Sequence, residues 1–259
     1  MSIDQVAEKY RLPDLCPALV DFIHRYMPSN SAPYLIGGQC STVAHSDIGS
    51  VKIQVWSGVR LQTKSFHNVD EVVPSKLANA CPPCEDWPLG LYDSVIINTD
   101  RSKIWPQSSL AGEWDFAGFD KWCMANVHAW TGHCVAQLQH ILQVIPPQGS
   151  TQPLPNAFLA YTQCFDVVPQ VNPKFSSQAG SFPEPAASMF ILKRSVRAGG
   201  VPLGDIIPLL QLRSVADLIP RFGAKADSWF TKQTSLAYSA KFWLNKYFDK
   251  PTYFALTLA

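Results

Sequence analysis

Two cysteines, Cys81 and Cys84, have the spacing of redox-active CxxC motifs. Thioredoxin-type chemistry places such a motif at the start of a helix that follows a strand, because the helix dipole lowers the thiol pKa. Here prolines fill and surround the motif, which favours an ordinary loop over a redox centre or a metal site. A zinc site would need two more ligands, and the sequence has neither a second CxxC nor an HxxxH. His133, Cys134 and His140 are too scattered to supply them, so no metal is expected.

Strand-end carboxylates are the second group that could do chemistry. Asp93, Asp100 and Asp166 adjoin β-rich runs, as metal ligands of nucleases do. A metal-dependent nuclease or hydrolase would need Asp93 and Asp166 within about 4 Å of a shared ion. The sequence has no GxSxG nucleophile elbow, and Gly37-Gly38 and Gly199-Gly200 lack the lysine of a phosphate loop. The favoured interpretation is a non-catalytic protein without a cofactor, and the remnant nuclease remains the alternative.

The last quarter of the chain is basic. Residues 190–259 carry 10 basic and 4 acidic groups, whereas the whole chain has a net charge of only +1. These cations interleave with aromatic residues, a composition that suits phosphate neutralisation and base stacking. The alternative to nucleic-acid binding is that the aromatic residues form part of the core and the lysines lie on the solvent-exposed face. The candidate nucleic-acid contacts are Arg194, Arg197, Arg221, Lys225 and Lys232.

The composition predicts how these groups are positioned. A hydrophobic content of 47% can fill a substantial core, and 21 prolines with 14 glycines suit short strands joined by turns. No stretch is apolar enough to cross a bilayer, so no membrane contact is expected. Seven cysteines at irregular spacing indicate free thiols and an intracellular protein, in the nucleus or the cytoplasm.

Helical spacing near the start predicts an N-terminal helical segment, residues 1–30, that packs on the core. A helix is expected from about Leu15 to Met27, with Asp14 as N-cap and Pro28 as the stop. Residues 31–259 are expected to form a single mostly β domain. Residues 51–63 predict a bent strand or a strand pair, residues 74–88 a proline-rich connection, and residues 134–145 a strand or a helix.

Further strands are expected at 91–98, 158–168, 189–196, 204–211 and 218–222, with a loop from 169 to 188 and a C-terminal helix near 235–247. The fold class is therefore mainly β with flanking helices (α+β), with a bent-strand barrel or a sandwich-like core. The residues expected to be buried are Trp56, Val95, Ile97, Val135, Leu138, Phe158, Phe165, Ile191 and Phe222.

Several phrases carry a family resemblance. The most specific are LIPRFG followed by AD, and YSAKFWLNKYFDK near the end; VWSGVRLQTKSFHNV, ACPPCEDWPLGLYDSVIIN and FLAYTQCFDVVPQ accompany them. Together they resemble the C-terminal region of basidiomycete Plavaka-type transposon-encoded proteins, a fungal domain of unknown function. The resemblance implies a transposon-associated accessory module and supplies no catalytic residue. The bent strands ending in a helix are also similar to bromo-adjacent-homology barrels, which read chromatin.

The sequence therefore favours a binding module for a protein or chromatin partner, or for DNA through the basic quarter. One segment, residues 113–132, interrupts the join from SLAG to HCVAQL that the resemblance implies. Codons for Gly112-Glu113-Trp114 and Thr131-Gly132 can contain intron-start and acceptor signals, and excision restores SLAGHCV. The segment is expected to be an insertion, with a retained intron as one hypothesis and a genuine loop that covers a core edge as the other.

Overall fold

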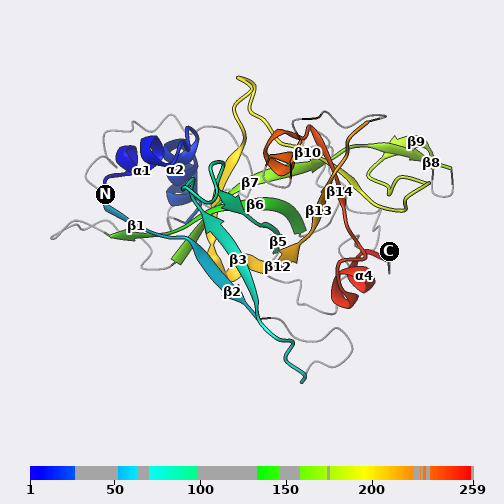
Figure 1. Cartoon of the computed structure of the whole chain (residues 1–259), viewed down its shortest axis with the longest axis horizontal. Coiled ribbons are helices and arrows are strands. Elements are labelled where there is room, and N and C mark those ends of the chain that lie inside the picture. The colour runs from blue at the N-terminus through cyan, green and yellow to red at the C-terminus, as the bar shows by residue number, and fades with distance from the viewer. Residues whose placement is uncertain are drawn as a thin grey trace.

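The computed structural model describes residues 1–26, 52–62, 70–98, 133–145, 158–173, 176–223, 228, 230–231 and 234–257. Within these ranges the protein is mainly β with few helices, and antiparallel sheets pack in a sandwich-like arrangement (Figure 1). The described strands do not close into a barrel. The segment 113–132 lies outside the described residues. None of the described helices is long and apolar enough to span a membrane.

Two helices open the chain. Helix α1 (Ile3–Lys9) starts with a capping box, in which the side chains of Ser2 and Gln5 each bond the other's backbone N–H. Helix α2 (Leu15–Tyr26) confirms the predicted second helix. The predicted capping role of Asp14 is wrong, because its carboxylate bonds Arg197 and the backbone of Gly204 instead. Pro28 lies outside the described residues.

The apolar stripes of both helices pack on one end of the main sheet. Ile3, Val6, Leu15, Leu19 and Phe22 are buried there together with sheet residues that include Leu142 and Ile206. The N-terminal helical segment thus covers one sheet face, as the helical spacing predicted.

The predicted strand pair at 51–63 is confirmed as β1 (Lys52–Trp56) and β2 (Gly58–Leu61), which enter different sheets. Strand β2 pairs with β3 (Lys76–Cys81), and β3 with β4 (Leu91–Tyr92). The interpretation of residues 74–88 as a proline-rich connection is wrong over β3, because Ala78 and Ala80 alternate with less buried neighbours and pack into the core.

The centre of the main sheet is the antiparallel pair β6 (His133–Ile145) and β7 (Phe158–Val167). Each of these long strands pairs with two successive strands on its outer side. Strand β6 pairs first with β5 (Ser94–Asn98) and then with β1. Strand β7 pairs first with β11 (Gly204–Pro208) and then with β10 (Ile191–Arg194). The sheet therefore forks on both sides of its central pair.

The remaining elements are β8 (Gln170–Asn172), β9 (Ser176–Gly180), the single turn η3 (Leu209–Gln211), β12 (Leu212–Ala216), β13 (Leu218–Pro220), α3 (Ser235–Tyr238), β14 (Lys241–Leu244) and α4 (Lys250–Thr257). Of these, β12, β13 and β14 extend the main sheet, and β8 and β9 form a separate two-stranded sheet. Strands β8 and β9 form a hairpin inside the segment expected to be a loop.

The predicted helix near 235–247 is wrong beyond Tyr238. Phe242 and Leu244 are buried while Lys241 is exposed, which is strand alternation, and β14 is paired on both sides by β10 and β13. After β14, a new helix, α4, begins at Lys250. Asp249 Oδ1 accepts a hydrogen bond from Thr252 N at 2.7 Å, as an N-cap does.

Six of the nine residues predicted to be buried are so: Val95, Ile97, Val135, Leu138, Phe165 and Ile191. Trp56 and Phe222 are only partly buried. Phe158 is 46% exposed, because it is the first residue of β7 and covers Trp56 edge-on at the sheet margin. The ends of strands are less enclosed than their centres, which the alternation alone does not reveal.

Candidate functional site

A pocket lies at the fork of the main sheet. On β6 the partner changes from β5 to β1 between Gln137 and Ile141, and a β-bulge between Leu138 and His140 falls at this point. On β7 the partner changes from β11 to β10 after Gln163. A bulge adds a residue to one strand and changes the direction of its side chains. The pocket therefore lies where the regular pairing of the sheet is interrupted.

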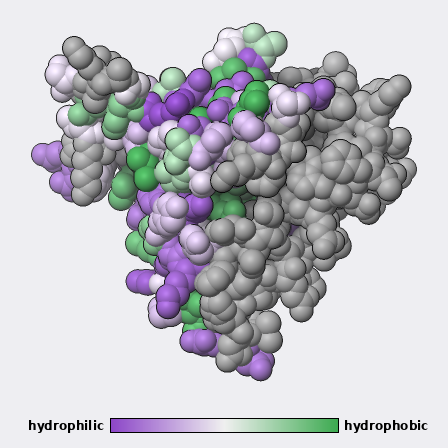
Figure 2. Space-filling model, turned by 90° about the vertical axis from the view of Figure 1, so that its right-hand side faces the viewer, coloured by the Kyte–Doolittle hydropathy of each residue, from purple (hydrophilic) through white to green (hydrophobic). Residues whose placement is uncertain are grey.

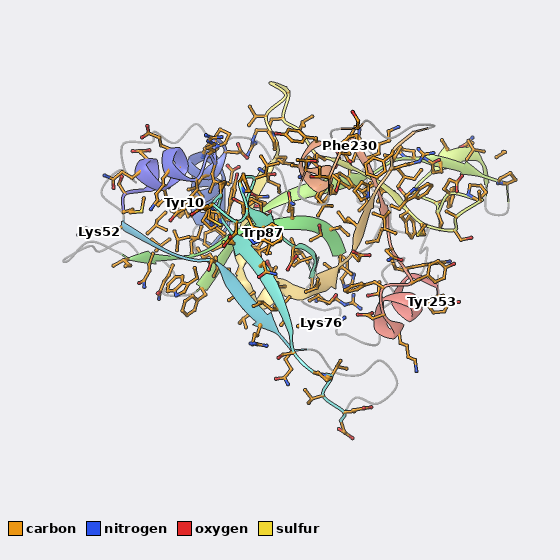
Figure 3. The ribbon with its side chains drawn as sticks, viewed as in Figure 1. Tyr10, Lys52, Lys76, Trp87, Phe230 and Tyr253 are labelled. Carbon is orange, nitrogen blue, oxygen red and sulfur yellow. The ribbon has the colours of Figure 1, made fainter. Side chains whose placement is uncertain are left out.

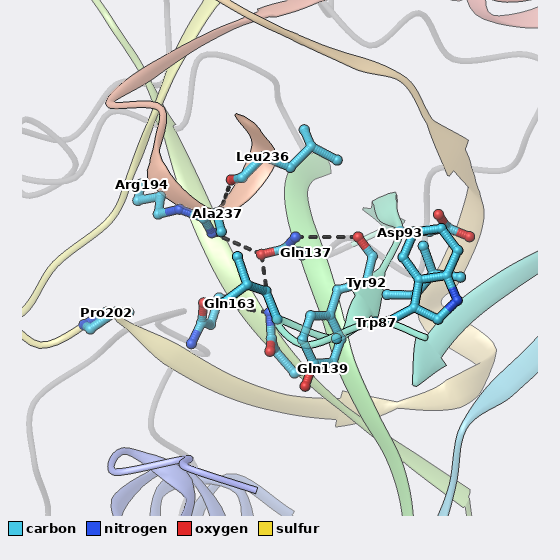
Figure 4. Close-up of a pocket in the computed structure, with 13 residues that line it drawn as sticks. Trp87, Tyr92, Asp93, Gln137, Gln139, Gln163, Arg194, Pro202, Leu236 and Ala237 are labelled. Atoms are coloured by element: carbon cyan, nitrogen blue, oxygen red, sulfur yellow. Dashed lines mark hydrogen bonds between the residues drawn. The ribbon is translucent and has the colours of Figure 1, made fainter. Parts of the chain in front are cut away.

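The pocket has a volume of about 300 Å³. Its floor carries three glutamines, Gln137 and Gln139 from β6 and Gln163 from β7 (Figure 4). Gln137 and Gln163 are direct cross-strand partners and therefore share a sheet face. The other lining residues include Trp87, Leu89, Leu91, Tyr92, Asp93, Arg194, Pro202 and Leu236.

Arg194 is the charged group of this floor. Its guanidinium donates to Gln137 Oε1 at 2.8 Å and to the Leu236 carbonyl at 2.6 Å. It also lies over two aromatic rings, 5.3 Å from the Phe165 centroid and 5.6 Å from that of Phe242. Burial lowers the pKa of Arg194 from its usual value. No carboxylate of the described part of the chain is within ion-pair distance of this guanidinium.

The side-chain amides of the glutamines form a chain of hydrogen bonds along the pocket. Gln137 Nε2 donates to the Tyr92 carbonyl at 3.2 Å, and Gln139 Nε2 donates to Gln137 Oε1 at 3.1 Å. A longer contact, 3.5 Å, joins Gln139 Nε2 to Gln163 Oε1. The Gln163 amide nitrogen has no acceptor among the described residues. Together with the remaining N–H groups of Arg194, it makes the site rich in donors.

The opposite wall is the hairpin loop between β3 and β4. Gly90 has φ +80°, and a Cβ there would lie 2.4 Å from the Tyr92 ring, so this turn requires glycine. Gly90 N and Cys84 N donate to the Trp87 carbonyl, at 2.8 and 3.0 Å. Asp93, at the edge of this wall, accepts two hydrogen bonds from Asn79, at 2.8 and 2.9 Å.

The predicted nucleic-acid contacts do not form one group. Arg194 lines the pocket, and Arg197 is partly buried beside Asp14, at 2.6 Å. Arg221 is exposed and lies 4.9 Å from the Trp243 ring centroid. Lys225 and Lys232 lie outside the described residues.

The carboxylate pair of the nuclease alternative is widely separated. Asp93 lies beside Leu138 of β6, and Asp166 of β7 lies beyond the Phe165–Val135 pair. This register puts them roughly 16 Å apart at strand spacings of about 4.8 Å and rises of about 3.3 Å. In the described ranges no group of three His, Cys, Asp or Glu side chains could hold a metal ion. Asp166 bonds Ser195 Oγ instead, at 2.6 Å.

The CxxC motif lies at the end of β3 and in the loop that follows. Cys81 is partly buried and Cys84 exposed, and both are free thiols. Burial, followed by the neighbouring Cys84, raises the pKa of Cys81, which is the opposite of the shift that an attacking thiol needs.

Sequence reasoning missed the three glutamines, Trp87 and Tyr92. A usable signal was present in residues 134–145, where Gln137 and Gln139 stand two residues apart in a mostly apolar strand. Polar residues at period two in a buried strand indicate a lined cavity or a polar network. The bulge beside Gln139 has no such signal in the sequence.

Comparison with known proteins gives a family without a function. No curated protein and no solved structure matches the chain significantly. A family model described as a domain of unknown function, DUF6830, matches residues 1–114 and 121–183. The interval between the two matched parts falls inside the segment 113–132. Since the match covers more than half of its length, the chain belongs to the DUF6830 family.

Proposed function

We propose that this protein is a non-catalytic binding module whose pocket holds a carboxylate of a protein partner. The observation that carries the proposal is Arg194, a partly buried cation whose described partners are two neutral oxygens. A buried charge is costly unless an opposite charge and hydrogen bonds compensate it. A carboxylate bound in the pocket would supply the missing charge.

The donor groups favour a carboxylate over a cationic or apolar ligand. Charge-assisted hydrogen bonds to an arginine are among the strongest in proteins, and the planar guanidinium suits the two oxygens of a carboxylate. The amide nitrogen of Gln163 adds a neutral donor on the same floor. A volume of about 300 Å³ takes one side chain, such as aspartate or glutamate, with its stem against Trp87 and Tyr92.

The wider role proposed is that of a transposon-associated accessory module in a fungal cell, in the nucleus or the cytoplasm. The phrases that resemble basidiomycete transposon-encoded proteins support this origin. A chromatin protein with an acidic segment would be a fitting partner for an arginine pocket.

The test compares two capped peptides, Ac-GGEGG-NH₂ and its Gln analogue Ac-GGQGG-NH₂, by calorimetric titration into the full chain. A charge-assisted hydrogen bond is worth about 1.5–3 kcal/mol, so the Glu peptide should bind at least tenfold more tightly. Arg194→Met should remove this preference. Arg60→Met, at an exposed arginine on β2, is the matched control and should retain it.

Two outcomes would overturn the proposal. Equal affinity of both peptides would show that the pocket does not distinguish a carboxylate from a neutral amide. Displacement of the Glu peptide by inorganic phosphate at lower concentration than by acetate would assign the pocket to a phosphate group instead. Circular dichroism and urea unfolding of each variant separate a binding defect from a folding defect.

A further inference from the structure

Exposed aromatic rings gather where β14 meets α4. Tyr247 is 62% exposed, Phe248 39% and Tyr253 37%. The Tyr247 and Tyr253 ring centroids are 5.8 Å apart, with an angle of 33° between the rings. Lys76 and Tyr253 mark this region, away from Trp87 and the pocket, in Figure 3. We call Lys246, Tyr247, Phe248, Lys250 and Tyr253 the C-terminal aromatic surface.

Lysines lie directly on these rings. Lys246 Nζ is 5.1 Å from the Tyr247 centroid and 6.0 Å from that of Tyr253. Lys76 Nζ, from the start of β3, is 4.4 Å from the Phe248 centroid and forms an ion pair with Asp249. Arg221 repeats the arrangement over Trp243, further back along β14. The exposed rings of Tyr247, Phe248 and Tyr253 therefore each have a cation close by.

The local charge is positive. The strands and the helix around this surface carry five basic residues against two acidic ones: Lys76, Arg221, Lys241, Lys246 and Lys250, and Asp217 and Asp249. Asp249 is paired with Lys76, and Asp217 accepts a hydrogen bond from Asn245 at 2.7 Å. On the side of the molecule that carries α4, the coloured atoms of Figure 2 show hydrophilic and hydrophobic residues interspersed, without one broad apolar patch. This mixture suits a charged, reversible ligand better than a permanent subunit contact.

We infer that the C-terminal aromatic surface binds single-stranded nucleic acid, with bases on Tyr247 and Tyr253 and phosphates on Lys246 and Lys250. A nucleotide carries a flat base and a phosphate close together, and each ring with its cation offers both contacts. A duplex hides its base faces, so only an unpaired strand can use the rings. This surface is separate from the pocket proposed above, and neither assignment depends on the other.

The experiment is fluorescence anisotropy of fluorescein-labelled dT15 with the full chain across a series of salt concentrations. Tyr247→Ala should weaken binding by about fivefold to a hundredfold and leave the salt slope unchanged, because stacking carries no counterion term. Lys246→Gln should reduce the slope by about 0.7, as expected when one phosphate of a single strand is no longer neutralised. Tyr238→Ala, at a tyrosine of α3 that is 53% exposed, is the matched control and should bind like the wild type.

Three results would overturn the inference. They are binding of a dT15·dA15 duplex as tightly as dT15, displacement of dT15 by poly-glutamate at equal charge concentration, and equal behaviour of Tyr247→Ala and Tyr238→Ala. The displacement would assign the surface to an acidic protein. Arg194→Met should bind dT15 normally, so failure of the pocket and failure of this surface are distinguishable.

Discussion

Asp14 Oδ1 lies 2.6 Å from Arg197 Nε, which ties the start of α2 to the turn between β10 and β11 across 183 positions of the chain. The other carboxylate oxygen accepts the Gly204 backbone N–H at 2.7 Å. Asp14 is buried, whereas Arg197 is partly exposed. One side chain thereby holds both the N-terminal helices and the fork of the sheet.

Arg197→Met should destabilise the protein by about 3 kcal/mol, because it leaves Asp14 buried without its cation. Urea unfolding measures the change. The double variant Asp14→Asn with Arg197→Met should lose less than the sum of the single losses, since both remove the same pair. Glu8→Gln, at an exposed carboxylate of α1, is the control. Additive single losses would show that the two residues act independently.

Gly204→Ala should cost about 1–3 kcal/mol through overpacking. A Cβ at position 204 would lie 2.3 Å from Tyr161 Oη and 2.6 Å from the same ring, which is fully buried. Gly199→Ala is the matched control, because none of the described residues comes within 4 Å of its added Cβ. Thermal unfolding should separate the two variants. Equal melting temperatures would contradict the close approach of Tyr161 to β11.

The stability should fall as the pH falls below 6.5, and His140 is the cause. Its ring is fully buried, 4.5 Å from the Tyr10 centroid and 6.3 Å from that of Tyr92. Neither ring nitrogen has a hydrogen-bond partner within the described part of the chain. Desolvation lowers the pKa of His140 to about 4. Burial raises the pKa of Tyr92 to about 12, so that neighbour stays neutral.

The folded-state pKa of His140 is below its unfolded value. The contribution of neutral His140 to the free energy of unfolding is therefore complete above pH 6.5 and is lost as the pH falls toward 4. Unfolding free energies at pH 7 and pH 5 should therefore differ by about 2 kcal/mol. His140→Phe should remove most of that difference. Asp249, whose pKa is lowered by Lys76 and Thr252 against the opposing effect of burial, loses its contribution only at lower pH. An unchanged pH dependence in His140→Phe would exclude the histidine.

Deletion of residues 113–132 should leave the free energy of unfolding unchanged or slightly higher, if the segment is a translated intron that adds an apolar patch. Sequencing of the transcript and the gene tests the origin directly. A gene without GTGAGT at this position and without a terminal AG, or an unfolded deletion variant, would show a genuine insertion.

The sequence predicted several main strands because their signal is local. Ile53 and Val55 alternate with Lys52 and Gln54, and Val95 lies in a short apolar run between polar residues. The C-terminal strand was predicted as a helix because Phe242, Trp243 and Tyr247 have helical spacing, and only the pairing of residues 241–244 with β10 and β13 shows that they form a strand. The pocket could not be predicted, since its glutamines and its arginine meet where the central strands change their partner strands. These changes depend on long-range pairing, which the local pattern leaves undetermined.

The most direct test of the pocket is a nitrogen–proton NMR titration of the full chain with N-acetyl-glutamate methylamide, detecting the Nε–H of Arg194 and the side-chain amides of Gln163 and Gln137. Because a carboxylate strengthens the hydrogen bond of a guanidinium, the Arg194 resonance should shift progressively and saturate together with that of Gln163, while the exposed Arg60 does not shift. The glutamine analogue should cause no such shift. Two results would contradict the assignment of the pocket to a carboxylate. One is an Arg194 resonance that does not shift with N-acetyl-glutamate methylamide, and the other is an equal shift with its glutamine analogue.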